Sequence, residues 1–130
     1  MADAKEKTCA LVASVASVNL NAVAATTLYT VPAGKTFVPH FVVVRALSAD
    51  AALAVATFGQ SGDKDDFLGA QTLSGLSAAG KAGILQPVPN ATTVAVVEYT
   101  AGEVFVIDVT TAADGACTAT VDVYGTLADA

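Results

Sequence analysis

The chain has 130 residues, of which 54% are hydrophobic and only 14% charged, and its formal net charge is −6. This length fits one domain that buries about two-thirds of the surface its unfolded chain exposes. Because Lys and Arg are few and scattered, and no run approaches the roughly 18 apolar residues of a membrane span, neither direct nucleic-acid binding nor membrane insertion is expected. The apolar residues exceed what one small core can hide, which predicts self-association.

Two features favour a cytosolic product over an exported one. The acidic residues Asp3 and Glu6 dilute the positive start that a secretory leader needs, so no cleaved leader is expected. Cys9 and Cys117 do not form the cysteine framework of small secreted domains, so we expect two reduced thiols.

Residues 1–24 are expected to form an extended N-terminal arm or a first strand. Val12, Val15 and Val18 are spaced as on a helix, but from Val18 onward apolar side chains alternate with other residues, as in a strand. The remaining residues, 25–130, are expected to form a single β-sandwich domain.

The letters AGKT at residues 33–36 match the end of a phosphate-binding loop, but the rest of that motif is missing. The pattern G-x-x-x-x-G-K-[ST] needs a glycine where this chain has Tyr29, and it needs a helix where this chain continues as a β-rich segment. Pro32 instead suits the second position of a reverse turn and Gly34 the fourth. The stretch predicts a corner between two strands.

A long strand is expected over residues 35–47, which contain Pro39 and the single histidine, His40. A proline early in a strand indicates an edge position or a bulge. His40 shares its alternation with Val38 and Val42, so we expect it on an apolar face or at an interface. One histidine cannot supply the ligand set of a metal-dependent jelly-roll enzyme, which favours a structural role, with a pH-responsive contact as the minor alternative.

Short strands continue through the middle of the chain. Alternating side chains favour a strand over residues 52–58, and weaker strands are expected over 67–73 and 84–88. A further strand over 92–99 is expected to reach the next one through the glycine-containing connection 100–103.

The C-terminal strands are the clearest. Alternation over residues 103–111 and 117–127 predicts two half-buried strands, with Asp122 on the polar face of the second. Between them, Asp114 and Gly115 form a dipeptide suited to a tight hairpin turn, so these two strands are expected to pair antiparallel.

Eight or nine short strands with a turn signal about every ten residues predict an all-β protein. The expected fold is an antiparallel β-sandwich with jelly-roll topology and an extended N-terminal arm.

No residue set predicts catalysis, a bound metal or a cofactor. Asp63, Asp65 and Asp66 carry enough oxygen atoms for a surface calcium site, but their spacing does not match a calcium loop, which favours a solvated turn. Glu98 and Glu103 flank one connection, where carboxylates usually face water. Without a nucleophile, base and orienting group, no enzyme activity is expected.

Two separated stretches, VNLNAVAATTLYTVPAGKTFVPHFVVVR and ATVDVYGTL, resemble small virion proteins of tailed bacteriophages, in which an LYTVPAGKT opening and a terminal VDVYG-like strand recur. The resemblance is to capsid decoration, or cement, proteins in particular. It implies a non-enzymatic protein that is made in the bacterial cytoplasm, sits on the capsid surface and bridges capsomers. It also implies homotrimers, the major capsid protein as partner, and no cofactor, nucleic acid or membrane.

The N-terminal segment is the candidate contact with the capsid or with a neighbouring copy, through main-chain pairing at a sheet edge. The candidate contact residues are its larger apolar side chains: Leu11, Val12, Val15, Val18 and Leu20.

Two other hypotheses compete with capsid decoration. A tail- or fibre-associated β-sandwich that binds a host surface glycan needs a concave aromatic and polar patch, whereas Tyr29, Tyr99 and Tyr124 are dispersed along the chain. An acidic secreted hydrolase needs a catalytic cluster, which the sequence does not offer.

Overall fold

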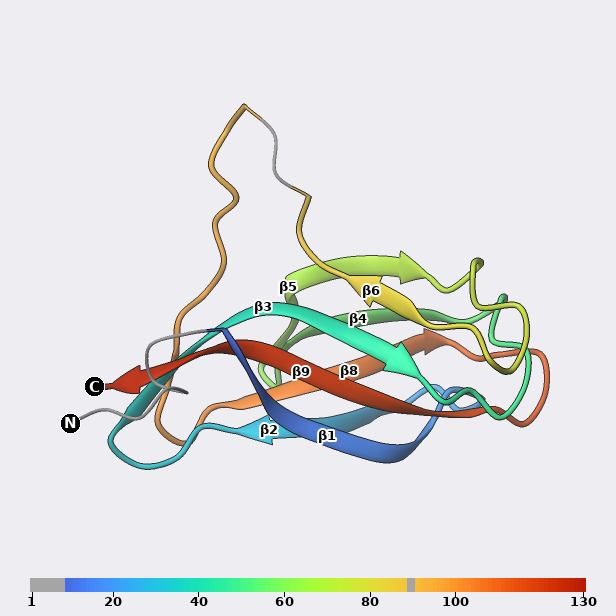
Figure 1. The fold of residues 1–130 in the computed structure, drawn as a ribbon, viewed down its shortest axis with the longest axis horizontal. Helices are drawn as coiled ribbons and strands as arrows, with labels where there is room; N and C mark the ends of the chain where they lie inside the picture. The colour runs from blue at the N-terminus through green and yellow to red at the C-terminus, as the bar shows by residue number, and fades with distance from the viewer. Residues whose placement is uncertain (1–8, 89–90) are drawn as a thin grey trace.

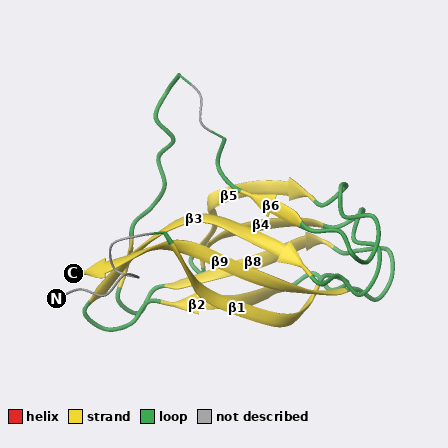
Figure 2. Ribbon diagram, in the orientation of Figure 1, coloured by secondary structure: helices red, strands yellow, loops and turns green. Residues whose placement is uncertain are grey.

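The computed structural model describes residues 9–88 and 91–130, and every regular element in these two ranges is a strand (Figure 2). The described ranges therefore contain no helix that could cross a bilayer. Their nine strands are β1 (Ala10–Asn19), β2 (Ala25–Thr30), β3 (Lys35–Arg45), β4 (Val55–Gln60), β5 (Asp63–Thr72), β6 (Gly83–Leu85), β7 (Tyr99–Thr100), β8 (Val104–Thr111) and β9 (Thr118–Asp129).

The strands form two antiparallel sheets that pack as a sandwich (Figure 1). Sheet A has the order β1-β9-β3-β6, with the short β7 also paired to β3, and sheet B has the order β2-β8-β4-β5. The chain crosses between the sheets after β1, β2, β3, β5, β7 and β8. This order is that of a jelly roll, with four main strands in each sheet. The expected antiparallel sandwich is confirmed, and residues 10–19 form its first strand.

The core lies between the sheets and is built from alternating side chains of the four central strands. β3 and β9 of sheet A supply mostly valines, while β4 and β8 of sheet B supply mostly larger side chains. The fully buried members are Phe37, Val42, Val44, Ala56, Phe58, Phe105, Ile107, Val121 and Val123.

Aromatic rings join the two sheets at one end of the core. Phe37, Tyr99 and Phe105 pack edge to face, with ring centroids 5.8 to 6.3 Å apart. Tyr29 extends this cluster 5.1 Å from Phe37. Phe67 extends it 5.5 Å from Phe105. Such pairs contribute about 0.5–1.5 kcal/mol beyond their buried area, so the cluster holds β3 and β7 of sheet A against β8 and β5 of sheet B.

The corner between β2 and β3 is confirmed, but the turn lies one residue later than predicted. The Lys35 amide donates to the Pro32 carbonyl over 3.2 Å, so Pro32 is the first residue of the turn and Gly34 the third. Gly34 has φ +77°, which a type II turn requires at its third position. The positive φ of the glycine, rather than the fixed φ of the proline, sets this turn.

Pro39 marks a bulge and not an edge. β3 lies between β9 on one side and β6 and β7 on the other, and its register with β9 shifts between Pro39 and Phe41. Gly125, the β9 partner of Pro39, has no room for a side chain: an added Cβ would lie 2.4 Å from the Phe37 ring and from the Val38 carbonyl oxygen. The proline and the glycine together produce this distortion.

Because a bulge reverses the alternation of a strand, His40 does not share the core face of Val42, and its expected position at an interface stays a prediction. Pro39 is buried before the bulge and Val42 after it, while His40 is exposed. Its Nε2 lies 2.9 Å from the Oγ1 of Thr126 on β9.

The predicted hairpin between residues 103–111 and 117–127 is wrong, although both strands exist. β8 belongs to sheet B and β9 to sheet A, so the residues between them cross from one sheet to the other. The crossover is anchored to the end of β1: the Ala113 amide donates to the Leu20 carbonyl, and the Leu20 amide donates to the Cys117 carbonyl. The alternation of side chains correctly predicted that each segment is a strand, but it could not predict which sheet each strand joins.

The strand expected over residues 92–99 is also wrong. Residues 91–98 form no strand, and β7 pairs only with Thr36 and Phe37 of β3 rather than with β8. The connection after it is the expected turn, in which Gly102 has φ +84°. The valines at 94, 96 and 97 resemble a strand in composition, but β3 pairs with the chain again only at Tyr99.

Candidate interaction surface

An apolar row crosses the outer face of sheet A. Leu11 of β1 and Phe41 of β3 are both register partners of Tyr124 on β9, so the three side chains point to the same face. The rings of Phe41 and Tyr124 are stacked, with centroids 4.7 Å apart and an interplanar angle of 15°. Leu11 beside them is 42% exposed.

A second row on the same face continues to the β6 edge. Val43 of β3 is the partner of Asp122 on β9 and of Ile84 on β6. Ile84 is 69% exposed. A sheet face that meets only water usually carries polar side chains, so these rows indicate a contact surface. We call the following residues the apolar strip: Leu11, Phe41, Val43, Ile84 and Tyr124.

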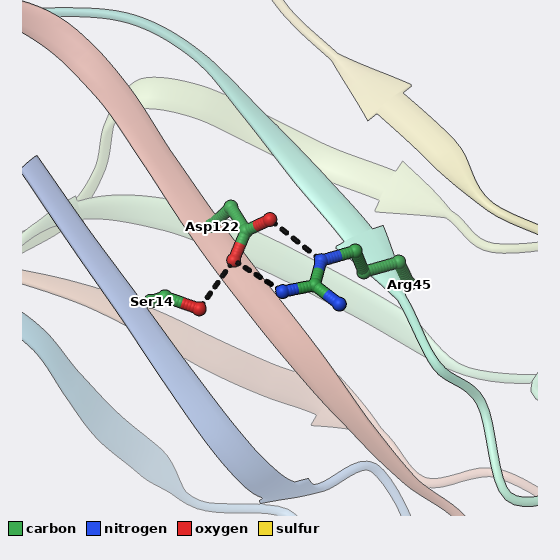
Figure 3. A network of polar contacts seen from close by, with 3 residues as sticks. All are labelled: Ser14, Arg45 and Asp122. Atoms are coloured by element: carbon green, nitrogen blue, oxygen red, sulfur yellow. Dashed lines mark hydrogen bonds and ion pairs between the residues drawn. The ribbon is translucent and has the colours of Figure 1, made fainter. Parts of the chain in front are cut away.

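One ion pair on this face ties three strands of sheet A together (Figure 3). Arg45 of β3 donates from Nε to Asp122 Oδ2 over 2.7 Å, and Ser14 of β1 donates from Oγ to Asp122 Oδ1 over 2.6 Å. Hydrogen bonding from Arg45, helped by that from Ser14, holds the pKa of Asp122 below its usual value although the carboxylate is buried. The charges on this face therefore compensate each other.

The alternation of β9 correctly placed Asp122 on the outer face, but its burial to 5% exposure was not predicted. The carboxylate is covered by Ser14 and Arg45, which approach from the two neighbouring strands. Strand alternation gives the face of a residue but not the side chains that lie beside it.

A long excursion separates the two short strands at the β3 edge. Leu85 of β6 pairs with Val42 and Tyr99 of β7 pairs with Phe37, so only four residues of β3 lie between these points. Thirteen residues, 86–98, connect them. Figure 1 shows the described parts of this excursion projecting beyond the edge of the sandwich.

Apolar side chains of the excursion face solvent. Val88 is 79% exposed, and Val94 and Val97 are also exposed. Val96 alone among its described valines packs against the core. The sequence predicts strands over residues 84–88 and 92–99 and gives no signal for an excursion, which becomes evident only from the pairing of β6 and β7 with β3.

A polar network lies where the β4–β5 hairpin meets β7. The Tyr99 hydroxyl donates to Asp66 Oδ1 over 2.6 Å, and the backbone N–H of Gln60 donates to the same oxygen over 3.1 Å. Burial of the ring, assisted by Asp66, raises the pKa of Tyr99 far above its usual value. Gln60 also donates from its side chain to Glu103, which accepts hydrogen bonds from Thr100 that lower its pKa.

The three aspartates of this hairpin do not form the predicted solvated turn. The turn is Ser61–Gly62, and Asp63 already begins β5. Asp66 is engaged by Tyr99, while a hydrogen bond with Asp65 raises the pKa of Asp63. No cluster of three or more potential metal ligands occurs within residues 9–88 and 91–130.

The candidate contact residues of the N-terminal segment divide into three groups. Val18 and Leu20 are buried in the core of their own chain, so they offer no surface to a partner. Val12 and Val15 are partly buried against that core. Leu11 is the member that faces solvent, and it belongs to the apolar strip.

The other singled-out residues lie apart from one another. Cys9 is exposed and Cys117 is buried, and both are free thiols. Lys35 Nζ lies 2.7 Å from Asp129 Oδ1 at the chain's other end. Glu98 is exposed on the excursion. The described residues enclose no pocket, so this part of the chain presents surfaces rather than a cleft.

No family model matches the chain, and a search of curated proteins finds no match either. Among solved structures, a chain of the cyanophage Pam1 capsid asymmetric unit has a similar fold, with a TM-score of 0.51 and 19% sequence identity. The similarity covers 88% of this chain and 81% of that chain. At this identity it supports the sandwich fold over nearly the whole chain.

Proposed function

We propose that this chain is a non-enzymatic structural protein of a tailed-phage capsid, which decorates the outer surface of the shell and stabilises it by bridging capsomers. The observation that carries the proposal is the fold similarity to a chain of a cyanophage capsid, which spans 88% of the sequence. The VPAGK corner and the VDVYG strand, which resemble those of phage virion proteins, lie in β2–β3 and β9 of this same sandwich.

The surface of the molecule suits such a role. A cement protein acts through contact area, and the outer face of sheet A offers stacked rings of Phe41 and Tyr124 beside exposed Leu11. Aromatic side chains are enriched in the cores of protein interfaces. Many weak contacts in an ordered lattice add up through multivalency, so no single contact needs to be strong.

The partners follow from this role. The major capsid protein is the proposed partner below, and further copies of this chain, assembled as a homotrimer, are the proposed partners beside it. Leu11 is the proposed contact residue of the N-terminal segment, since Val18 and Leu20 are enclosed in the core.

Cosedimentation with expanded, DNA-free capsids tests this proposal. Saturable binding is expected for the wild type, and Leu11→Asp is expected to weaken it by at least about tenfold, because an unpaired charge would be buried at the contact. Val23→Asp is the matched control, since Val23 is also exposed but lies outside the sheets. Failure of the wild type to sediment with capsids would refute the proposal.

The glycan-binding alternative predicts the opposite outcome in a parallel assay. A tail- or fibre-associated module would bind host surface polysaccharide and leave capsids unbound. The aromatic stack of Phe41 and Tyr124 is the one feature that favours it, because sugar rings pack on aromatic faces, but the described residues form no pocket around this stack.

A further inference from the structure

The excursion of residues 86–98 is longer than its connection requires. A strand that continued from Leu85 to Tyr99 along β3 would need about four residues at the spacing of a β-strand. The additional residues cost conformational entropy when they are ordered. Apart from Val96, the described valines of this segment are exposed and give no core packing in return.

The excursion carries a single charged side chain, that of Glu98 at its junction with β7. Residues 82–97 contain no Asp, Glu, Lys or Arg, although the whole chain carries a net charge of −6. A partner recognised by charge would find only the Glu98 carboxylate to pair with, at one end of the segment. A second uncharged surface would fit, because contact would then bring no like charges of the two acidic chains together.

The apolar strip on sheet A is such a surface. Its side chains are apolar or aromatic, and the charges of Arg45 and Asp122 beside them neutralise each other. The strip ends at Ile84, two residues before the excursion begins. The exposure of Val88, Val94 and Val97 shows that the excursion does not cover the strip of its own chain.

We propose that the described residues of the excursion of one protomer pack on the second row of the apolar strip, Val43 and Ile84, of a second copy of this chain. The row of Leu11, Phe41 and Tyr124 is left for the capsid. The excursion projects from the β6 edge of sheet A, whereas the strip lies on the outer face of that sheet, so the contact joins two different surfaces (Figure 1). A contact between different surfaces is head-to-tail and closes into a ring when the rotation allows it. This arrangement gives the self-association in the proposed function a specific interface.

Charged substitutions on the excursion test this interface by sedimentation equilibrium. The wild type is expected to sediment as an oligomer, with a mass at least twice the 12.9 kDa of one chain. Val94→Asp combined with Val97→Asp is expected to weaken self-association at least about tenfold, because two unpaired carboxylates would be buried. Leu53→Asp combined with Val23→Asp is the matched control at exposed apolar positions elsewhere and is expected to keep the wild-type mass.

A shortened chain removes the excursion and, of its described valines, loses only Val96 as a contact with the core. Replacing residues 86–98 by four residues joins β6 directly to β7 along β3. The shortened protein is expected to unfold cooperatively and to sediment as a monomer. A shortened or doubly substituted protein that kept the wild-type mass, or a wild type that was itself a monomer, would overturn the inference.

Disulfide trapping identifies the surface that the excursion meets. Val94→Cys and Val43→Cys are made in separate chains, each with Cys9→Ser to remove the exposed native thiol. A disulfide-linked dimer is expected only when the two variants are mixed. Linkage of the Val94→Cys variant with itself would instead show that two excursions meet, which contradicts the head-to-tail contact.

The inference and the proposed function can fail separately. A monomer that still binds capsids would overturn the interface and leave capsid decoration standing. An oligomer that depends on the excursion but does not bind capsids would overturn capsid decoration and leave the interface standing.

Discussion

Gly125 of β9 lies directly against Phe37 of β3. A Cβ added at Gly125 would lie 2.4 Å from Cε1 of the phenylalanine ring, a distance at which one of the two strands must move. Phe37 cannot give way easily, because it is fully buried and packs on Tyr99 and Phe105. The absence of a side chain at this position allows β3 and β9 to pair across the bulge at Pro39.

Gly125→Ala is therefore expected to reduce the free energy of unfolding by about 1–3 kcal/mol, as overpacking does in other cores. Gly62→Ala is the control, since an added Cβ there meets no atom within 4 Å. Chemical denaturation of both variants measures the difference. Equal stability of the two would contradict the close approach of Gly125 and Phe37.

Gly34→Ala is expected to destabilise the β2–β3 corner by about 1–2 kcal/mol. Gly34 has φ +77°, and a Cβ is disfavoured in this left-handed region even though there is space for it. Gly34→Asn should lose less, because asparagine tolerates this conformation better. Thermal unfolding of the two variants provides the comparison, and an alanine variant as stable as the wild type would show that the turn does not need a positive φ.

Asp122→Asn is expected to remove part of the acid sensitivity of the fold. Arg45 and Ser14 lower the pKa of Asp122 in the folded state, so the carboxylate contributes stability above its unfolded pKa and loses it as the pH falls through the lowered folded value. The wild type should thus lose more stability than the variant as the pH falls below about 4. Denaturation curves measured over this pH range isolate the effect of Asp122, because all other carboxylates are common to both proteins. If the stabilities of the two proteins fell in parallel with pH, the role of this ion pair would be contradicted.

Tyr99→Phe is expected to cost about 1–2 kcal/mol, since it deletes the hydroxyl that donates to Asp66 and leaves the ring packing unchanged. Tyr29→Phe retains the edge contact with Phe37 and is expected to change stability by less than about 0.5 kcal/mol. Urea denaturation distinguishes the two variants. A larger loss for Tyr29→Phe than for Tyr99→Phe would exclude the Asp66 hydrogen bond as a stabilising contact.

The sequence predicted the sandwich because alternation at a period of two is a local property of each strand. Val121, Val123 and Ile107 lie inside as their alternation requires. The hairpin between β8 and β9 was mispredicted because a turn-forming dipeptide, Asp114-Gly115, also fits a crossover between sheets. Partner choice depends on contacts made far along the chain, such as that of Ala113 with Leu20.

The interaction surface was harder to predict than the fold. Leu11 was identified from its apolar character, but Phe41 and Tyr124 meet only after β3 and β9 have paired around the bulge. Residues 92–99 were assigned to a strand because they are rich in valine. Composition cannot show that β6 and β7 pair with β3 on either side of this segment. Their pairing leaves the excursion between them outside the sheet.

Cryo-electron microscopy of expanded capsids, with and without the added protein, tests capsid decoration most directly. The proposal predicts ordered difference density on the outer surface of the shell, in which each sandwich touches more than one capsomer. Occupied capsids in which every copy of the protein lay within a single capsomer, or capsids without any added density at saturating protein, would contradict it.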